Sequence, residues 1–277
     1  MSNITESKDK LFQFSTIKDL TYIFERISSI KMNQIKDLVA ARKLFFEDVW
    51  KLYSGLKLGG LLMDQDRVKK FVPKNTFAYV LVSSDSGFTG RVNNQVINAM
   101  QDDMKGQQDL YVIGGKGRGI LEERNIRYKK SYNFHDYKDD KFIRLLLGDL
   151  KGYETIVIWY DSFVSISKQL PKKMEVTFNP NRMDRSLVIK PSQYIFEPSY
   201  KEILSYLESI MIGLMFSQIL AETDLSLNAS RMVLMNRASE RAQNLYNNEK
   251  LIFNRLHREQ KDNEVKLIFE DYKNAVK

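Results

Sequence analysis

The sequence predicts an α/β protein: a long antiparallel coiled coil of N- and C-terminal helices plus a small open α/β (Rossmann-like) domain. Three observations support this prediction. Residues 199–277 contain no proline and one glycine, and their apolar residues recur at helical spacing. Residues 17–63 also lack proline and carry a similar apolar stripe. The sequence between them changes to short β-branched and aromatic runs separated by polar helical stretches, as in a βαβ fold.

The N-terminal helix is expected over residues 17–63, after a flexible N-terminal segment of residues 1–16. Its apolar residues alternate in steps of three and four, which is the spacing of a coiled-coil seam. The stripe contains Leu20, Ile23, Ile27 and Ile30, then after one slip Ile35, Leu38, Phe45, Val49, Leu52 and Leu56. We expect Ile27 and Leu38 to lie in the coiled-coil core, where burial of each contributes about 1.5–3 kcal/mol.

The α/β domain is expected over residues 73–197. Apolar runs bounded by turn residues predict three strands, at residues 76–82, 110–113 and 155–159. The loops 83–90 and 114–119 follow the first two strands, where open α/β sheets bind their ligands.

The glycine-rich run 114–119 indicates a tight turn. It lacks the spacing of a dinucleotide fingerprint and the ending of a phosphate-binding loop. Asp85 follows a strand, but no second acid, histidine or lysine forms a recognisable constellation with it. The chain has no cysteine, and His135 and His257 are far apart in sequence. We therefore predict no catalytic, cofactor-binding or metal-binding residue in this chain.

The C-terminal helix is expected over residues 199–277, as the second helix of the coiled coil. Ser199 and Glu202 form a capping box, in which each side chain accepts a hydrogen bond from a backbone amide of the first turn. The matching seam contains Leu234, Ala238, Leu245, Ile252 and Leu256. Leu245 and Ile252 are accordingly predicted to be core residues.

Charge and hydropathy exclude two other classes of protein. The net charge of +8 is spread along the chain, and acids interrupt the basic residues of the C-terminal helix, so we predict no nucleic-acid binding. The richest apolar run, residues 210–220, is too short to cross a bilayer and contains Gln218, so no direct membrane span is expected. The first fifteen residues lack the apolar centre of a secretory signal, and we expect a soluble, intracellular chain.

Residues 222–242 carry the most specific pattern in the chain. Small residues surround an Ala-x-Arg-Met-Val-x-Met pattern at Ala229, Arg231, Met232, Val233 and Met235. This stretch resembles the signature region of the gamma subunit of F-type ATP synthases.

The resemblance extends over nearly the whole chain. Residues 39–44 are similar to a Val-Ala-Ala-Ser-Lys-Leu run of the gamma N-terminal helix, and residues 84–90 to its Ser-Asp-Arg-Gly-Leu-Cys-Gly loop. Residues 115–117 resemble a Gly-x-Lys-Gly turn after its second strand, and residues 196–199 the Tyr-Glu-Pro-Ser before its C-terminal helix. The motifs match in order and in spacing.

The resemblance implies a central rotor shaft that couples ATP hydrolysis or synthesis in a surrounding hexameric ring to rotation. The implied partners are alpha- and beta-like nucleotide-binding subunits, three of each, an epsilon-like subunit, and a membrane ring or a replacement machine. ATP, ADP and Mg would be bound by the partner subunits, with no cofactor in this chain. The implied location is cytoplasmic, peripheral at the inner face of the cell membrane.

Some positions depart from the gamma pattern. Residues 257–264 are charged where the family has an apolar tip, Lys36 and Asp37 replace its methionine and lysine, and Arg91 replaces a glycine. Two versions stay open: a diverged gamma subunit, or the shaft of a paralogous F1-like ATPase that drives another machine, such as gliding motility. A coiled-coil scaffold and a nucleotide enzyme are alternatives of other classes.

Individual contact residues follow from the shaft hypothesis. Four exposed cations are candidates for contacting the ring: Lys36, Arg241, Arg255 and Arg258. Asp85 and Arg91 are candidates for contacting an epsilon-like subunit or the driven machine. A solvated helix face explains any one of the cations about equally well, and a structural loop explains Asp85 and Arg91.

Overall fold

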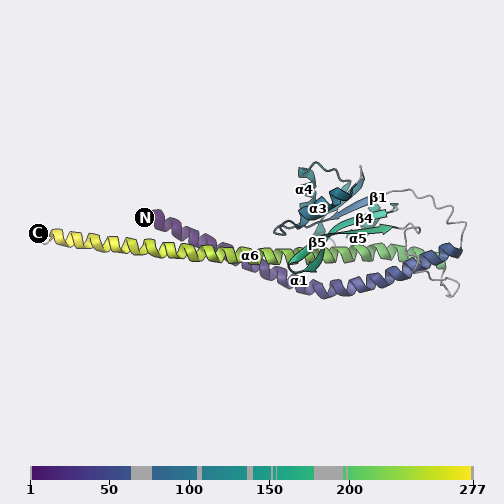
Figure 1. Cartoon of the computed structure of the whole chain (residues 1–277), viewed down its shortest axis with the longest axis horizontal. Helices are drawn as coiled ribbons and strands as arrows, with labels where there is room; N and C mark the ends of the chain where they lie inside the picture. Colours follow the sequence, from purple (N-terminus) through teal and green to yellow (C-terminus); the bar gives the residue numbers. More distant parts are fainter. Residues whose placement is uncertain are drawn as a thin grey trace. The chain divides into compact units, whose positions relative to one another are not determined.

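Two long helices frame the chain in the computed structural model, which describes residues 2–63, 77–104, 108–135, 140–150, 152–153, 155–177, 196–197 and 199–275. They are α1, Ser2–Met63, and α6, Tyr200–Ala275 (Figure 1). The amide of Glu202 donates to Ser199 Oγ (3.3 Å), the half of the predicted capping box that the structure describes. Residues 2–16, predicted to be flexible, belong to α1, because no proline or glycine interrupts the helix there.

A five-stranded sheet lies between the two helices in sequence. Its strands are β1 (Phe77–Val82), β2 (Asp109–Ile113), β3 (Lys130–Tyr132), β4 (Thr155–Ser165) and β5 (Lys168–Thr177). The order is β3-β2-β1-β4-β5, with β5 antiparallel to β4 and the other neighbours parallel. This arrangement confirms the predicted open α/β domain.

Helices cover both faces of the sheet (Figure 1). On one face, α3 (Val92–Asp103) and α4 (Gly115–Glu123) cover a core that includes Ile97 and Leu121. On the other face, α5 (Asp140–Leu150) and α6 cover a larger core, in which Phe216 is completely buried. The sheet domain is therefore anchored directly to the long C-terminal helix.

The structure differs from the prediction inside this domain. The strands β3 and β5 were not predicted, because both are edge strands with a polar composition, and β5 contains Pro171. The glycine run predicted to be a tight turn is the first turn of α4. A Cβ at Gly117 would lie 2.3 Å from Ser83 Oγ, so this glycine permits a close approach of the helix to β1. The predicted domain limits at residues 73–76, and residues 178–195, lie outside the described residues.

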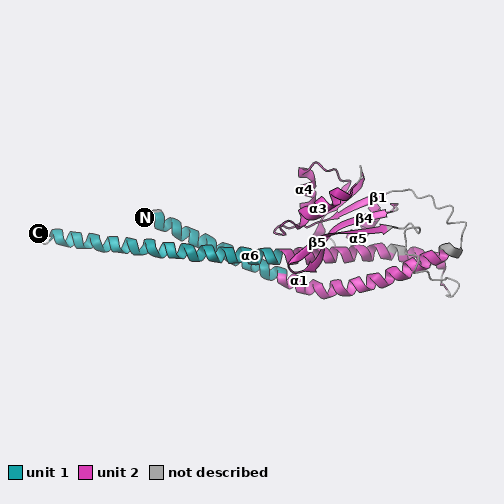
Figure 2. Ribbon diagram, in the orientation of Figure 1, with its two compact units in different colours: residues 1–28, 231–277 teal, residues 29–230 magenta. Residues whose placement is uncertain are grey.

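The chain divides into two compact units (Figure 2). Unit 1 consists of Met1–Ser28 and Arg231–Lys277, and unit 2 of Ser29–Ser230. In unit 1 the two helices are antiparallel: Ser7 Oγ donates to Glu249 Oε1 (2.7 Å), and the Lys18 ammonium lies 5.7 Å from the ring centre of Tyr246. Residues 261–275 of α6 are all exposed.

The seam of unit 1 contains many polar residues. Buried or half-buried positions of α1 recur in steps of three and four, at Ile4, Ser7, Leu11, Phe14, Lys18, Thr21, Glu25 and Ser28. On α6 the corresponding positions are Met235, Ser239, Ala242, Tyr246, Glu249, Phe253, Leu256 and Gln260. This is heptad spacing, but half of these residues are charged or polar, and polar seam positions weaken a coiled coil.

The helix pair of unit 2 has an apolar seam. The buried residues Met32, Ile35 and Val39 of α1 continue the same steps, and Tyr53 is fully buried against Met211 of α6. Arg42 Nη1 donates to Ser217 Oγ (3.0 Å), and the Tyr200 hydroxyl donates to the Leu56 carbonyl oxygen. A later residue of α1 pairs with an earlier residue of α6, since Arg42 contacts Ser217 and Leu56 contacts Tyr200. This pair is therefore also antiparallel.

The four residues predicted to form the coiled-coil core are exposed. Ile27 and Leu38 of α1 are 44% and 46% exposed, and Leu245 and Ile252 of α6 are both 48% exposed. The predicted core assignment was therefore wrong for all four. In unit 1 the face that pairs is more polar than the stripe chosen from the sequence. In unit 2 the buried stripe runs through Ile35 and Val39 and leaves Leu38 exposed.

By length and composition alone, α6 could cross a membrane, since it contains an 18-residue window of mean hydropathy 1.6. Its apolar residues Met215, Phe216, Ile219 and Leu220 are buried in the core of unit 2. Packing against the sheet accounts for their hydropathy.

Candidate functional site

The outer face of α1 in unit 1 is the first candidate site. Leu20, Ile23 and Ile27 each follow a seam residue by two positions, which corresponds to a rotation of about 200° around the helix. They are 44–51% exposed, and Phe12 on the same helix is 74% exposed. A helix pair with polar residues inside and large apolar residues outside presents a surface suited to contact with another protein.

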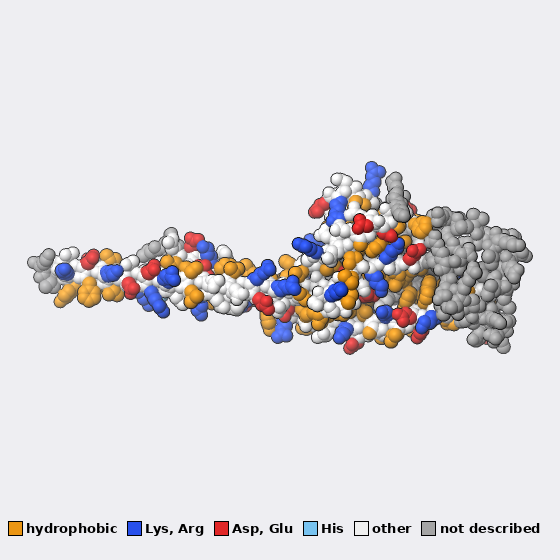
Figure 3. Space-filling model, viewed as in Figure 1, with side chains coloured by type: hydrophobic (Ala, Val, Ile, Leu, Met, Phe, Trp, Pro, Cys, Tyr) orange, Lys and Arg blue, Asp and Glu red, His pale blue; other side chains and the backbone are white. Residues whose placement is uncertain are grey.

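The helix α6 also carries exposed apolar residues in unit 1. Leu251 is 70% exposed, and near the C terminus Val265, Ile268, Phe269 and Tyr272 are 52–71% exposed (Figure 3). These four residues occupy one helical stripe, at i, i+3, i+4 and i+7. The tip therefore has an apolar face after the charged residues 257–264, a feature that our sequence reasoning missed because it stopped at the charged run.

The predicted ring-contacting cations are all exposed. Lys36 lies on α1 in unit 2, and Arg241, Arg255 and Arg258 lie on α6 in unit 1. Since long cationic side chains on a helix surface are also common in proteins without partners, exposure alone does not test the prediction.

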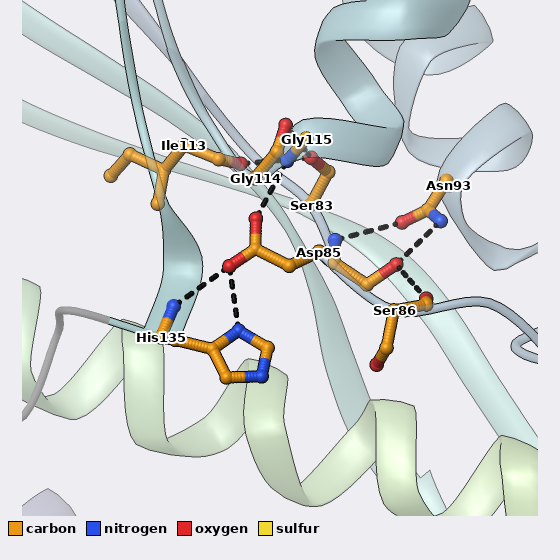
Figure 4. A network of polar contacts seen from close by, with 9 residues as sticks. Ser83, Asp85, Ser86, Asn93, Ile113, Gly114, Gly115 and His135 are labelled. Atoms are coloured by element: carbon orange, nitrogen blue, oxygen red, sulfur yellow. Dashed lines mark hydrogen bonds and ion pairs between the residues drawn. The ribbon is translucent and has the colours of Figure 1, made fainter.

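The loop between β1 and α3 is built around Asp85 (Figure 4). One carboxylate oxygen accepts from the Gly115 amide (2.7 Å), at the first residue of α4. The other accepts from the His135 amide (2.9 Å) and lies 2.6 Å from His135 Nδ1. Burial alone would raise the pKa of Asp85, but the hydrogen bonds from Gly115 and His135 outweigh it and lower the pKa below its usual value.

Asp85 therefore ties the first loop of the sheet to α4 and to the end of β3. Its carboxylate is 18% exposed, whereas His135 is 72% exposed. This supports the structural-loop explanation of Asp85 given above. Arg91 is exposed at the start of α3, where its carbonyl oxygen accepts from the Gln95 amide.

Phe88 is a further candidate in this loop that sequence reasoning missed. It is 61% exposed and adopts φ 63°, a left-handed conformation that is unfavourable for a residue with a bulky side chain. The loop is held on both sides of it: Asn93 Nδ2 donates to Ser84 Oγ (2.9 Å), and Ser230 Oγ of α6 donates to the Thr89 carbonyl oxygen (3.1 Å). An exposed aromatic side chain in a strained loop is a candidate contact for a partner.

The first half of the signature stretch joins α6 to the sheet. Ser226 Oγ donates to the buried Asp161 carboxylate of β4, and Ser162 Oγ donates to Glu222 Oε1. Asp161 is 1% exposed, and its second carboxylate oxygen has no hydrogen-bond partner among the described residues. Burial raises the pKa of Asp161 to about 6, and the Glu222 charge adds to this effect. Nothing in the sequence pattern marked Asp161.

Small residues in this stretch allow the close packing. Ala221 and Ala229 are almost completely buried, and so are Thr223, Ser226 and Asn228. The described side chains include no group of three or more histidines and acids placed to bind a metal ion. The signature stretch therefore joins α6 to the sheet, and the exposed residues of unit 1 and of the Asp85 loop offer surfaces for contact with other proteins.

The comparisons with known proteins agree on one family. The family model described as ATP synthase matches residues 3–269. This chain belongs to that ATP synthase family. Among curated relatives it is 24% identical to an ATP synthase gamma chain of Christiangramia forsetii, over 96% of each chain. It is 23% identical to an ATP synthase gamma chain of Mycoplasmopsis pulmonis, over 92% of this chain and 93% of the relative.

Solved structures show the same fold in ATP synthase. This chain is similar in structure to a chain of the rotor of the mitochondrial ATP synthase of Euglena gracilis. The TM-score is 0.70 and the identity 14%, over 94% of this chain and 99% of the other. A chain of the central stalk and c-ring structure from Tetrahymena thermophila matches with a TM-score of 0.56 and 18% identity, over 79% of this chain and 99% of the other. The shaft-like fold predicted from the sequence is thereby confirmed.

Proposed function

We propose that the chain is the central rotor shaft, or gamma subunit, of an F-type or F1-like rotary ATPase. It couples ATP hydrolysis or synthesis in a surrounding hexameric ring to rotation. The observation that carries the proposal is unit 1: an antiparallel helix pair with polar residues in its seam and large apolar residues on its outside. A rod that turns inside a protein sleeve needs contact surface on its outside.

The shaft carries out no chemistry in this proposal. A ring subunit can turn the shaft only if its successive nucleotide states bind different faces of the shaft with different affinities. The surface of unit 1 is chemically uneven, because it carries exposed apolar residues such as Ile23 and exposed cations such as Arg241 and Arg255. Lys36 and Arg258 are further candidate contacts.

The proposed partners are three alpha-like and three beta-like subunits, an epsilon-like subunit, and a membrane ring or the machine that replaces it. ATP, ADP and Mg are bound by the ring subunits in this proposal. The sheet domain stands at the base, with Asp85, Arg91 and the exposed Phe88 on the loop that faces the epsilon-like subunit. The complex is placed in the cytoplasm, at the inner face of the cell membrane.

The test is to tag the chain in its native host, purify it under mild conditions, weigh the intact complex and assay ATP hydrolysis. We expect one copy of the chain with three copies each of two nucleotide-binding proteins. A membrane ring in the same complex identifies a synthase, whereas other proteins in its place identify an F1-like ATPase that drives a different machine. A lone chain without ATPase activity would overturn the proposal and favour a coiled-coil scaffold.

A further inference from the structure

A groove of about 900 Å³ lies between three helices of unit 2. It is lined by α1 from Lys31 to Arg42, by α6 from Ile210 to Asp224, and by Ile143 and Arg144 of α5. Neither the predicted shaft contacts nor the Asp85 loop lines it. It is therefore a separate feature of the surface.

The floor of the groove is apolar. Ile35 and Ala221 are buried there, Ile143 and Leu214 are half-buried, and Leu38 is 46% exposed. A Cβ at Gly213 would lie 3.7 Å from the Ile143 side chain, so α5 and α6 approach each other closely at this glycine. The groove therefore contains a strip of apolar side chains that is partly exposed to solvent.

The rim of the groove is cationic. Among the described side chains that line it, Lys31, Arg42 and Arg144 are cationic and Asp224 is the one acid. Arg42 is half-buried and donates to the neutral Ser217 hydroxyl (3.0 Å), which holds the guanidinium in place without neutralising it. Asp224 accepts from Asn228 Nδ2 (2.8 Å) in its own helix. The local charge favours an acidic occupant.

The dimensions favour a helix over a small molecule. The lining spans 12 residues of α1 (31–42) and 15 residues of α6 (210–224), which corresponds to about 16–21 Å of helix. Small-molecule sites enclose most of their ligand, whereas this strip is flanked by helices and its floor residue Leu38 is 46% exposed. A helix laid in a groove instead makes contact along one face through residues at i, i+3, i+4 and i+7.

We propose that this groove binds an amphipathic, acidic helix of about 12–15 residues from a partner protein. Its apolar face lies on the Ile35, Leu38 and Leu214 strip. Its carboxylates lie about three turns apart, opposite Lys31 and Arg42. The inference rests on the proposed function in one respect: the partner is sought among the proteins of the complex that the shaft forms.

The test places the photo-crosslinking residue benzoylphenylalanine at Leu38 of the full chain in its host complex. The matched control is Leu44, a leucine of the same helix that is 65% exposed and does not line the groove. We expect position 38, and not position 44, to crosslink to one acidic amphipathic segment, identified by mass spectrometry. The Arg42→Glu variant should reduce this crosslink at least tenfold, and an acid→Lys change in the identified segment should restore it.

A crosslink from position 38 to a lipid, to a second copy of this chain or to a segment without acids would overturn the inference. So would a crosslink yield at position 38 no higher than at position 44, or a failure of the acid→Lys change to restore the crosslink of the Arg42→Glu variant. Circular dichroism of the Arg42→Glu variant shows whether the helices are intact, and Arg42→Gln serves as a second variant if they are not. The same preparation reports the stoichiometry with nucleotide-binding subunits. A ring without the crosslink contradicts only the groove, and a crosslink without a ring contradicts only the rotor function.

Discussion

The two units contain the same pair of helices but distribute their apolar residues in opposite ways. In unit 2 the seam is apolar, and the sheet adds a core around Phe216. In unit 1 the seam includes Ser7, Lys18 and Glu249, while Leu20 and Ile23 face outward. Because burial of apolar surface dominates folding, we expect unit 2 to be stable by itself and unit 1 to depend on a partner that covers it. This difference in the placement of apolar residues distinguishes unit 2, which carries the folding core, from unit 1, which carries the exposed contact surface.

The largest expected effect tests the core of unit 2. Phe216→Ala removes a completely buried aromatic side chain, so the free energy of unfolding should fall by about 3–5 kcal/mol. Leu251→Ala, at a 70% exposed position of unit 1, should change it by less than about 0.5 kcal/mol. Urea denaturation of both variants measures the contrast. Equal losses would contradict the division into a folding unit and a docking unit.

The second prediction concerns Asp161, the one carboxylate among the described residues of unit 2 that is buried in the core. The folded-state pKa of Asp161 is raised from 3.8 to about 6, so the folded protein holds this proton more tightly than the unfolded chain. Stability contributed by the protonated group is present at about pH 4 and is lost as pH rises through 6. Asp161→Asn should therefore be more stable than the parent at pH 8, by up to about 3 kcal/mol, with little difference at pH 4.

The control for this pH dependence is Asp149→Asn. The hydrogen bonds from Lys130 and Tyr132 lower the pKa of Asp149, so its stabilising contribution is present above its unfolded pKa and is lost as pH falls. Asp149→Asn should be the less stable variant at neutral pH. Thermal unfolding between pH 4 and pH 8 measures both, and curves of the same sign would show that burial of Asp161 has been misjudged.

The third prediction concerns a variant that makes the polar seam of unit 1 more apolar, like the seam of unit 2. Thr21 lies in the seam and is half-buried, and its hydroxyl donates to the Ile17 carbonyl oxygen (2.8 Å). Thr21→Leu should stabilise the helix pair by about 1 kcal/mol, because it adds apolar contact where the seam is polar. Hydrogen exchange of the unit 1 amides measures the change.

A matched control exists five residues away, on a different face of the same helix. Thr16 is exposed and makes the same hydroxyl bond, to the Phe12 carbonyl oxygen (2.9 Å). Thr16→Leu gains the same helix propensity but no seam contact. If both variants slow hydrogen exchange equally, propensity and not the polar seam limits the stability of unit 1.

The smallest expected effect concerns a single bond in the seam of unit 1. Ser7→Ala removes the hydrogen bond to Glu249 (2.7 Å), and it should cost about 1 kcal/mol or less because the pair is partly exposed to water. Faster exchange should be confined to amides of unit 1. Exchange that also accelerates in the sheet would show that the two units unfold together.

The sequence predicted the architecture, the three central strands and the family, since these depend on length, periodicity and a long specific pattern. It did not predict the edge strands β3 and β5, whose polar residues carry no strand periodicity. It misplaced Ile27 and Leu245, because we assumed that the most apolar stripe of a helix faces its partner helix. That assumption holds for a protein that folds alone, and unit 1 departs from it.

The prediction of the candidate sites was similarly uneven. Asp85 was identified from its position after a strand, but its hydrogen bonds to Gly115 and His135 depend on the fold and left no pattern in the sequence. The contact of Asp161 with Ser226 joins residues 65 positions apart, and no local pattern could reveal it.

The apolar outer face of unit 1 also affects how the protein is made. Newly synthesised copies that have not met their partners carry Phe12, Leu20, Ile23 and the C-terminal stripe in water, and such surfaces promote aggregation. We therefore expect excess copies to aggregate unless chaperones hold them or proteases remove them. On this reasoning, production of this chain is expected to be matched to that of the proteins that cover it.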